Sequence, residues 1–354
     1  MDKGYVVLLE IKFFTVAILS FLLVKIVIRL AHKLDLYDVP NERSHHCRIT
    51  PSGAGIGFMG AFFIAIAFFE FQFLSEFWYI FLAIFLIFAI GVYDDRHDVS
   101  AKLKFIAIFF SSFILWVNGL SVDTLGSWYG YEVMFPSVFA LFFSMFVLAG
   151  FTNALNLIDG IDGLSTSISL VILLFFAFIG FEYHNNLLVV LSTFTMATLV
   201  GFLFINWHPA KIFMGDSGSL AIGFIISVLA ILSLEHIHPI AVFYLTAIPT
   251  LDTLIVMTRR IRRGNSPFSP DKTHIHHIMV KFFDMNVPKT VFFLVLLQII
   301  FSSVGYMIVS SINEGLSEHI PLFATIGFVF MFILFYMIFT GIKKRQIRLD
   351  SEFG

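Results

Sequence analysis

The residues from Asn153 to Gly163 form the densest group of chemically capable side chains in this sequence of 354 residues. Two Asn, two Asp and two Gly fall within eleven positions, and apolar runs lie on either side. Each Gly follows an Asp, so the backbone can turn tightly and a ligand can approach it closely. Polar side chains are costly in apolar surroundings, so we expect this group to face water, a metal ion or a polar ligand.

The spacing within this group indicates a shared direction. Asn153, Asn156, Asp159 and Asp162 recur every three residues. On a helix, that spacing places all four side chains on one face. Amides combined with carboxylates suit a nucleotide, a phosphate-bearing metal ion, or both. The alternative is the polar lining of a water-filled vestibule.

A second acidic segment holds Asp94 and Asp95 side by side. Adjacent carboxylates repel each other unless a cation or a proton relieves the repulsion. The repulsion could be relieved by a divalent ion, by a substrate proton, or by Lys102 and Lys104 of the following segment. A solvated acid pair in a loop is common, so this segment alone is weak support for a site.

Asp216 lies between Gly215 and Gly218 at the expected start of a helix. A carboxylate there is an oxygen ligand suited to Mg²⁺, which keeps several waters and shares the phosphates of a substrate. The alternative is that Asp216 only caps the helix. Phe213, three residues earlier, could stack on a planar base or serve as an ordinary core aromatic.

The segment 259–289 combines arginines with three histidines. His274, His276 and His277 offer alternating donors that suit a diphosphate, and a metal site is the competing interpretation. Arg260 and Arg263 are as well explained by an anchor facing anionic lipid as by substrate contact.

The segment 31–57 is basic and rich in Pro and Gly. It could bind phosphate where its Gly-rich turn enters a helix, or it could be an ordinary basic loop. A zinc site from His45, His46 and Cys47 is not expected, because adjacent residues converge poorly on one tetrahedral ion.

Composition shows what kind of elements must position these groups. Hydrophobic residues make up 58% of the chain and charged residues 13%, and the mean hydropathy is +0.92. A soluble domain carries about a quarter charged residues, so the chain is predicted to be an all-α polytopic integral membrane protein. Its single cysteine excludes an intramolecular disulfide.

A helix needs about 20 apolar residues to cross the hydrocarbon. Neither a repeat nor a low-complexity linker is visible, so we expect one integral domain over residues 1–354. The sequence predicts about eleven transmembrane helices, at roughly 8–30, 53–72, 77–93, 103–120, 134–152, 164–181, 187–205, 217–234, 239–258, 290–312 and 320–341.

The basic residues predict the orientation of these helices. Alternate connections contain no Lys or Arg: 72–76, 121–133, 182–186, 235–238 and 313–319. Basic loops stay cytoplasmic, so we expect the N-terminus outside and the C-terminus in the cytoplasm. All four chemically capable segments then fall in cytoplasmic loops, which favours one shared active site on the inner face.

Taken together, these segments resemble the polyprenyl-phosphate N-acetylhexosamine-1-phosphate transferases. The resemblance covers essentially the whole chain, and its most specific parts are Asp94-Asp95, Asn153 to Gly163, and Phe213 to Gly218. It implies transfer of a sugar-1-phosphate, most often that of N-acetylglucosamine, from a UDP-sugar to undecaprenyl phosphate, with release of UMP. Mg²⁺ is the implied cofactor, with Mn²⁺ as a substitute.

The resemblance also implies a setting. The enzyme would lie in the bacterial inner membrane and initiate O-antigen, common-antigen or related glycan synthesis. Its partners would be UDP-N-acetylhexosamine, undecaprenyl phosphate and the lipid bilayer, a homodimer is allowed, and no nucleic acid is expected. The segment 266–277 resembles the branch that uses plain N-acetylhexosamines, whereas Ser52 and Ala54 depart from the pattern of many members.

Position by position, the resemblance assigns Asp216 to the metal and Asp94, Asp95, Asp159 and Asp162 to catalysis, with Asp94 favoured for deprotonating or positioning the lipid phosphate. Direct displacement is expected over a two-step route with an aspartyl-phosphate. Substrate contacts are implied at Arg48, Lys104, Asn153, Asn156, Phe213, His274, His276 and His277.

The main rival interpretation is a transporter for a metal or small solute. Transporters keep ionisable groups near the middle of the membrane. Here the mid-span positions are almost bare, apart from Glu10 and Lys12 near one end of the first span and Asp252 in the inner half of the ninth, and Lys25 lies towards the inner end of the first span. The clustering of acids at one face therefore favours an enzyme.

Overall fold

The computed structural model describes residues 3–38, 49–97, 99–266 and 274–353. This part of the chain is almost entirely helical, with two small two-stranded sheets. Its internal contacts divide it into two compact units, one made of Met1–Leu125 with Met134–His236 and the other of Gly126–Val133 with Ile237–Gly354.

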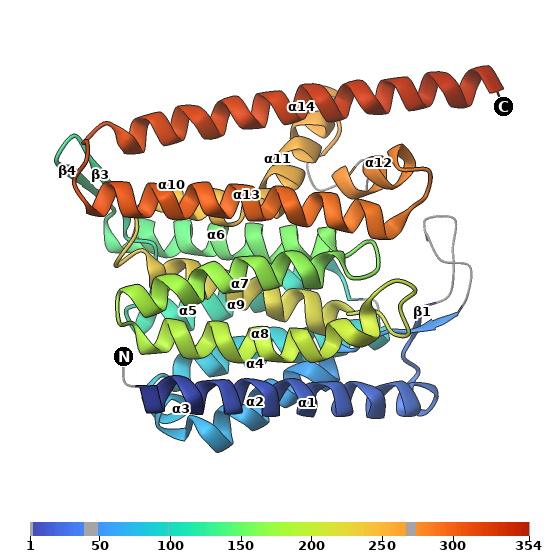
Figure 1. The fold of residues 1–354 in the computed structure, drawn as a ribbon, viewed down its shortest axis with the longest axis horizontal. Helices are drawn as coiled ribbons and strands as arrows, with labels where there is room; N and C mark the ends of the chain where they lie inside the picture. The colour runs from blue at the N-terminus through green and yellow to red at the C-terminus, as the bar shows by residue number, and fades with distance from the viewer. Residues whose placement is uncertain (1–2, 39–48, 98, 267–273, 354) are drawn as a thin grey trace. The chain divides into compact units, whose positions relative to one another are not determined.

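The first unit contains nine helices and one short sheet among the described residues (Figure 1). The helices are α1 (Lys3–Leu34), α2 (Gly55–Phe69), α3 (Phe71–Glu76), α4 (Trp78–His97), α5 (Ala101–Val117), α6 (Ser137–Ile158), α7 (Leu164–Glu182), α8 (Asn186–Asn206) and α9 (Asp216–Ser233). The sheet pairs β1 (Tyr37–Asp38) with β2 (Thr50–Pro51) in antiparallel register.

The second unit contains the last five helices of the described chain and most of the other sheet. The sheet pairs β3 (Thr124–Trp128) with β4 (Tyr131–Met134). The helices are α10 (Pro239–Leu245), α11 (Ala247–Arg262), α12 (Ile275–Phe282), α13 (Val287–Asn313) and α14 (Ile320–Phe353).

Many of these helices are long and apolar enough to cross a membrane, which agrees with a mostly helical, polytopic membrane protein. Among the described residues, eight helices pass that test singly, and α10 with α11 passes it as a pair bent by 90°. Two of the predicted eleven spans coincide with shorter helices, α2 of 15 residues and α5 of 17. At 1.5 Å per residue, such helices fall short of the hydrocarbon thickness of about 30 Å.

The core of the first unit is built around α9, which packs against α4, α6, α7, α8 and α2. Glycines let the helix axes approach closely. A Cβ on Gly91 of α4 would lie 2.6 Å from the carbonyl oxygen of Asp216, and a Cβ on Gly223 of α9 would lie 2.9 Å from Thr152 of α6. This tight packing places the first turn of α9 directly beside the C-terminal part of α4.

In the second unit, the break between α10 and α11 leaves backbone groups without helical partners, and α13 supplies replacements. Gln298 accepts a hydrogen bond from the Ile248 N–H (3.0 Å) and donates one to the Leu245 carbonyl (2.8 Å). Ser302 also donates to Leu245 (3.2 Å). Both side chains are fully buried, so the bend is stabilised without water.

Candidate active site

The candidate site is built around the first residue of α9, Asp216. The segment before it is held by backbone pairing with the turn that follows β2. The Phe213 N–H donates to the Pro51 carbonyl (2.9 Å), and the Phe213 carbonyl accepts from the Ala54 N–H (3.1 Å). The Gly55 N–H donates to the Met214 carbonyl (3.0 Å). The turn of residues 51–55, considered from sequence as a phosphate loop, therefore braces the loop that carries Phe213 and Asp216.

Gly215 can be no other residue without local rearrangement. Its φ of +74° lies in the left-handed region that favours glycine. A Cβ there would also lie 2.7 Å from both the Asp95 Oδ1 atom and the Gly53 N atom. Because Gly215 has no side chain, the Asp95 carboxylate can lie against the start of α9.

Asp95, from α4, accepts hydrogen bonds from the first amides of α9. Its Oδ1 atom accepts the Asp216 N–H (2.6 Å), and its Oδ2 atom accepts the Ser217 N–H (3.3 Å). A carboxylate at a helix N-terminus satisfies orphan amides and complements the helix dipole. The cap of α9 is therefore Asp95, and the side chain of Asp216 is left for other interactions.

Lys104, from α5, lies between two carboxylates. Its Nζ atom is 2.6 Å from the Oδ2 atom of Asp94 and also bonds the Oδ2 atom of Asp216. Asp94 is additionally fixed through its Oδ1 atom, which accepts the Val99 N–H (2.6 Å). Lys104 thus contacts both Asp94 and an aspartate that lies 112 positions after it in the sequence.

Asn156, from α6, completes the surroundings of Asp216. Its Nδ2 atom donates to the Asp216 Oδ1 atom (3.0 Å) and contacts the Ser219 Oγ atom (2.9 Å). Each oxygen of Asp216 therefore has a defined partner, yet its side chain is 27% exposed. Asn153 lies one turn earlier on α6 and is half-buried.

Asp162 and Asn206 brace the loop between α8 and α9. The Asp162 Oδ2 atom is 2.8 Å from the His208 Nδ1 atom and accepts the Ala210 N–H (3.0 Å). The Asn206 Oδ1 atom accepts the Gly163 N–H (3.1 Å), and its Nδ2 atom donates to the Ile212 carbonyl (3.1 Å). The loop carrying Phe213 is therefore tied to the turn that carries Asp162.

Asp159 is the C-cap residue of α6, and in the sequence it lies between Asn156 and Asp162. The pKa of its carboxyl is raised to about 7, and the largest cause is the loss of hydration on burial. The negative charges of Asp216, Asp162 and Asp95 contribute the rest of that increase. Asp159 is thus close enough to the other carboxylates for their charges to oppose its ionisation.

The three histidines lie in the second unit, where Asp252 of α11 holds the first of them. The Asp252 Oδ2 atom is 2.8 Å from the His274 Nδ1 atom, and its Oδ1 atom accepts the Ile275 N–H (2.6 Å). The ring of His276 lies 5.7 Å from that of His274 and 4.1 Å from that of His277. The histidines therefore form one cluster at the start of α12.

The donor set in the first unit fits a magnesium ion. Carboxylate oxygens of Asp94 and Asp216 converge on the same cationic nitrogen, and Mg²⁺ prefers such oxygens. Among the described residues, no three His, Cys, Asp or Glu side chains are grouped so as to enclose a metal. Mg²⁺ is usually bound through one or two carboxylates, with waters and substrate phosphates completing its shell.

The sequence-predicted residues are therefore partly assembled. The structure brings together Asp94, Asp95, Lys104, Asn156 and Asp216. The half-buried Phe213 lies on the loop that leads to Asp216. Arg48 lies outside the described residues, so its predicted role stays a prediction.

Sequence reasoning assigned no role to Asn206, His208 or Ser219, although all three contact site residues. Polar side chains in a short loop between two apolar runs were the available indication. In the sequence, Asp252 is only an isolated acid within a predicted span.

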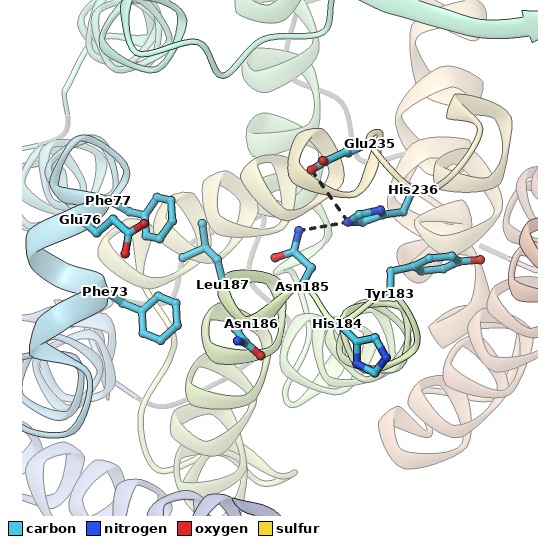
Figure 2. Close-up of a pocket in the computed structure, with 10 residues that line it drawn as sticks. All are labelled: Phe73, Glu76, Phe77, Tyr183, His184, Asn185, Asn186, Leu187, Glu235 and His236. Carbon is cyan, nitrogen blue, oxygen red and sulfur yellow. Dashed lines mark hydrogen bonds and ion pairs between the residues drawn. The ribbon is translucent and has the colours of Figure 1, made fainter. Parts of the chain in front are cut away.

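A separate hollow lies at the other ends of the same helices (Figure 2). It has a volume of about 460 Å³ and is lined by residues of the α3–α4, α7–α8 and α9–α10 connections. Asn185 donates there to His236 (3.3 Å), whose ring stacks on Tyr183 at 5.1 Å. The lining contains Glu76 and Glu235 and neither Lys nor Arg, so it does not suit a diphosphate.

Comparison with known proteins gives consistent matches. The family described as Glycosyl transferase family 4 matches residues 77–234. A Bacillus subtilis (strain 168) protein is 31% identical over 96% of this chain and 94% of its own length; it is named "Probable undecaprenyl-phosphate N-acetylglucosaminyl 1-phosphate transferase". Proteins named undecaprenyl-phosphate alpha-N-acetylglucosaminyl 1-phosphate transferase are similar as well. The one from Yersinia pestis is 32% identical over 72% of each chain, and the one from Escherichia coli (strain K12) is 33% identical over 72% of this chain and 71% of its own.

Proposed function

The chain belongs to the family of polyprenyl-phosphate N-acetylhexosamine-1-phosphate transferases, and on that premise we propose that it transfers N-acetylglucosamine-1-phosphate from UDP-N-acetylglucosamine to undecaprenyl phosphate. The products are undecaprenyl-diphosphate-linked N-acetylglucosamine and UMP. This is the first, lipid-loading step of a cell-surface glycan such as O-antigen or common antigen.

One observation carries this proposal: two carboxylates and one lysine from three helices converge at the start of α9. Asp94, Lys104 and Asp216 lie within direct contact of one another through the Lys104 Nζ atom. A diphosphate and a lipid phosphate are both anionic, so their reaction needs neutralised charge and alignment more than a strong base. A lysine beside cation-binding carboxylates provides that combination.

The reaction forms one P–O bond and breaks another. An oxygen of the lipid phosphate attacks the phosphorus that carries the sugar, and the bond from that phosphorus to the bridging oxygen of UMP breaks. The second pKa of a phosphate monoester is about 6, so the lipid phosphate is largely ionised near neutrality. Asp94 takes any residual proton from it or holds it in line.

Magnesium, when bound at Asp216 beside Asp94, supplies positive charge that neutralises the diphosphate. Mn²⁺ has similar ligand preferences and would substitute for it. Lys104 offers a further positive charge to substrate oxygens, and Asn156 orients the Asp216 carboxylate through its amide. Asp159 adds negative charge that favours cation binding once it ionises.

Asp95 and Asp162 act by positioning in this scheme. Asp95 holds the first turn of α9, and Asp162 holds the loop before it, so both set the place of Asp216. Phe213, on that loop, stacks on the uracil. Asn153 extends the polar face of α6 towards the nucleotide, and Arg48 contributes a basic side chain.

His274, His276 and His277 contact the sugar and diphosphate in this scheme. We also propose that the chain has the eleven predicted spans, with the N-terminus outside and the C-terminus in the cytoplasm. The enzyme then lies in the bacterial inner membrane, as one domain that is free to form a homodimer. A soluble UDP-sugar and a membrane-bound polyprenyl phosphate can meet at the inner interface without either crossing the bilayer.

The direct test incubates membranes containing this protein with UDP-N-acetylglucosamine labelled in the sugar, undecaprenyl phosphate and Mg²⁺. We expect label in the lipid fraction and release of equimolar UMP, both abolished by chelation. Membranes containing Asp216→Asn serve as the control. Label that accumulates inside sealed vesicles without a lipid product would support the transporter interpretation instead.

A further inference from the structure

The carboxylate of Asp252 is buried in the second unit with both oxygens occupied. Asp252 is only 1% exposed. One oxygen is 2.8 Å from the Nδ1 atom of His274, and the other accepts the Ile275 N–H at 2.6 Å. The contacts link α11 to the first residues of α12 across 22 positions of sequence.

Capping alone does not account for a carboxylate at this place. Ser or Asn caps a helix N-terminus as well as Asp does, and neither brings a charge into an apolar helix. Burying a carboxylate is costly unless a specific partner compensates for it. The partner here is the imidazole of His274, whose side chain is 4% exposed.

This contact determines where the imidazole carries its proton. A carboxylate accepts hydrogen bonds and does not donate them, so the ring hydrogen at this edge is on Nδ1. The Nε2 atom, on the opposite edge, is then the one that exchanges a proton or accepts a hydrogen bond. Because the ring stacks near His276, its orientation is held on the face as well as at the edge.

We propose that Asp252 is a positioning residue, which holds His274 with Nδ1 protonated so that the unprotonated Nε2 faces the substrate as a hydrogen-bond acceptor. This inference rests on the proposed function for the role of His274, whereas the proton position on the ring is independent of it.

Asp252→Asn tests the proposal with little change of shape. The Asn carbonyl can still accept the Ile275 N–H, but its amide donates to Nδ1 and moves the ring proton to Nε2. We compare purified wild type, Asp252→Asn, His274→Ala and the double variant, with the exposed Asp284→Asn as a control for a lost carboxylate.

We expect Asp252→Asn to lower kcat by about 10- to 100-fold, with a smaller change in KM for the UDP-sugar and an unchanged thermal midpoint. The double variant should be no slower than His274→Ala, because Asp252 acts through that ring. The pH–rate profile of Asp252→Asn should change in the limb that His274→Ala abolishes, with His276 and His277 left in place as neighbouring titratable groups. Additive losses in the double variant, or an unchanged profile, would overturn the proposal.

A second measurement separates this inference from the proposed function. Nitrogen-15 spectra of histidine-labelled protein, with the His274 signal assigned by its loss in His274→Ala, report which ring nitrogen is protonated. We expect Nδ1 in wild type and Nε2 in Asp252→Asn. If the enzyme assay yields no lipid product, the proposed function fails while the spectra still test the pair. A wild-type ring protonated at Nε2 alone overturns the pair whatever the assay shows.

Discussion

Two polar clusters in this apolar protein differ in how completely their atoms are satisfied. At the break between α10 and α11, Gln298 and Ser302 are neutral, fully buried and bonded to backbone groups. At the start of α9, Asp216 is charged and 27% exposed, and it shares Lys104 with Asp94. The first cluster repairs a helix, whereas the second keeps charged groups at a place that a ligand can reach.

The difference separates polar groups that serve folding from polar groups that serve chemistry. A neutral buried network stabilises the fold only when its donors and acceptors pair within the protein. A carboxylate cluster with excess negative charge is instead relieved by a cation or an anionic ligand with its counterion. Substitutions in the two clusters should therefore differ in kind, with the largest loss of activity expected at Asp216.

Replacing Asp216 with Asn should nearly abolish the reaction. The amide keeps the size of the side chain but removes the negative charge proposed to bind Mg²⁺, and we expect a loss of about 10³-fold in turnover. Thermal unfolding in detergent should change little. The measurement is lipid-linked product formation by purified protein, with the exposed Asp123→Asn as the matched control. Turnover like that of wild type would remove Asp216 from the metal site.

Replacing Asp94 with Asn should cost less, about 10²-fold in turnover, because the lipid phosphate is already mostly ionised. The residual rate should rise with pH as the phosphate loses its own second proton. A pH–rate profile of Asp94→Asn beside that of wild type makes the comparison. A uniform loss at every pH would instead indicate that Asp94 only positions Lys104 or the lipid phosphate.

Replacing Gln298 with Leu should destabilise the fold without changing chemistry. The Ile248 N–H would lose its acceptor in a dry environment, at a cost of about 1–3 kcal/mol in unfolding free energy. Ser303→Ala, on an exposed face of the same helix, removes only a bond to its own backbone and should cost less than about 0.5 kcal/mol. Turnover per folded molecule should match wild type in both variants. Reduced turnover in folded Gln298→Leu would place the bend in the catalytic machinery.

Magnesium affinity should rise with pH around neutrality, by a few-fold. The pKa of Asp159 is raised to about 7, first by burial and then by neighbouring carboxylates. A bound cation favours the ionised form, so affinity strengthens as pH rises through 7 and weakens below it. Asp159→Asn, which is neutral at every pH, should flatten this dependence. Titrations of Mg²⁺ at pH 6, 7 and 8 measure the slope, and an unchanged slope in the variant would assign it to another group.

Local sequence was enough to predict the membrane class, most helices and the residue types of the site. Hydropathy is a property of consecutive residues, and the Asp-Gly and Asn-x-x-Asn patterns are local as well. The three predicted spans that lack a single long helix are the exceptions, because α2 and α5 are short and a 90° bend divides α10 from α11. The bend is stable only because a side chain some fifty residues later satisfies it.

The sequence by itself determined that this chain is a helical membrane protein with clustered acids, and its motifs determined the family. Only the tertiary structure decided which acid does what. Asp94 and Asp95 are adjacent in sequence, yet one contacts Lys104 while the other caps a helix that begins 121 residues later. Neighbours on a helix point in directions about 100° apart, so their roles depend on which elements pack against each side.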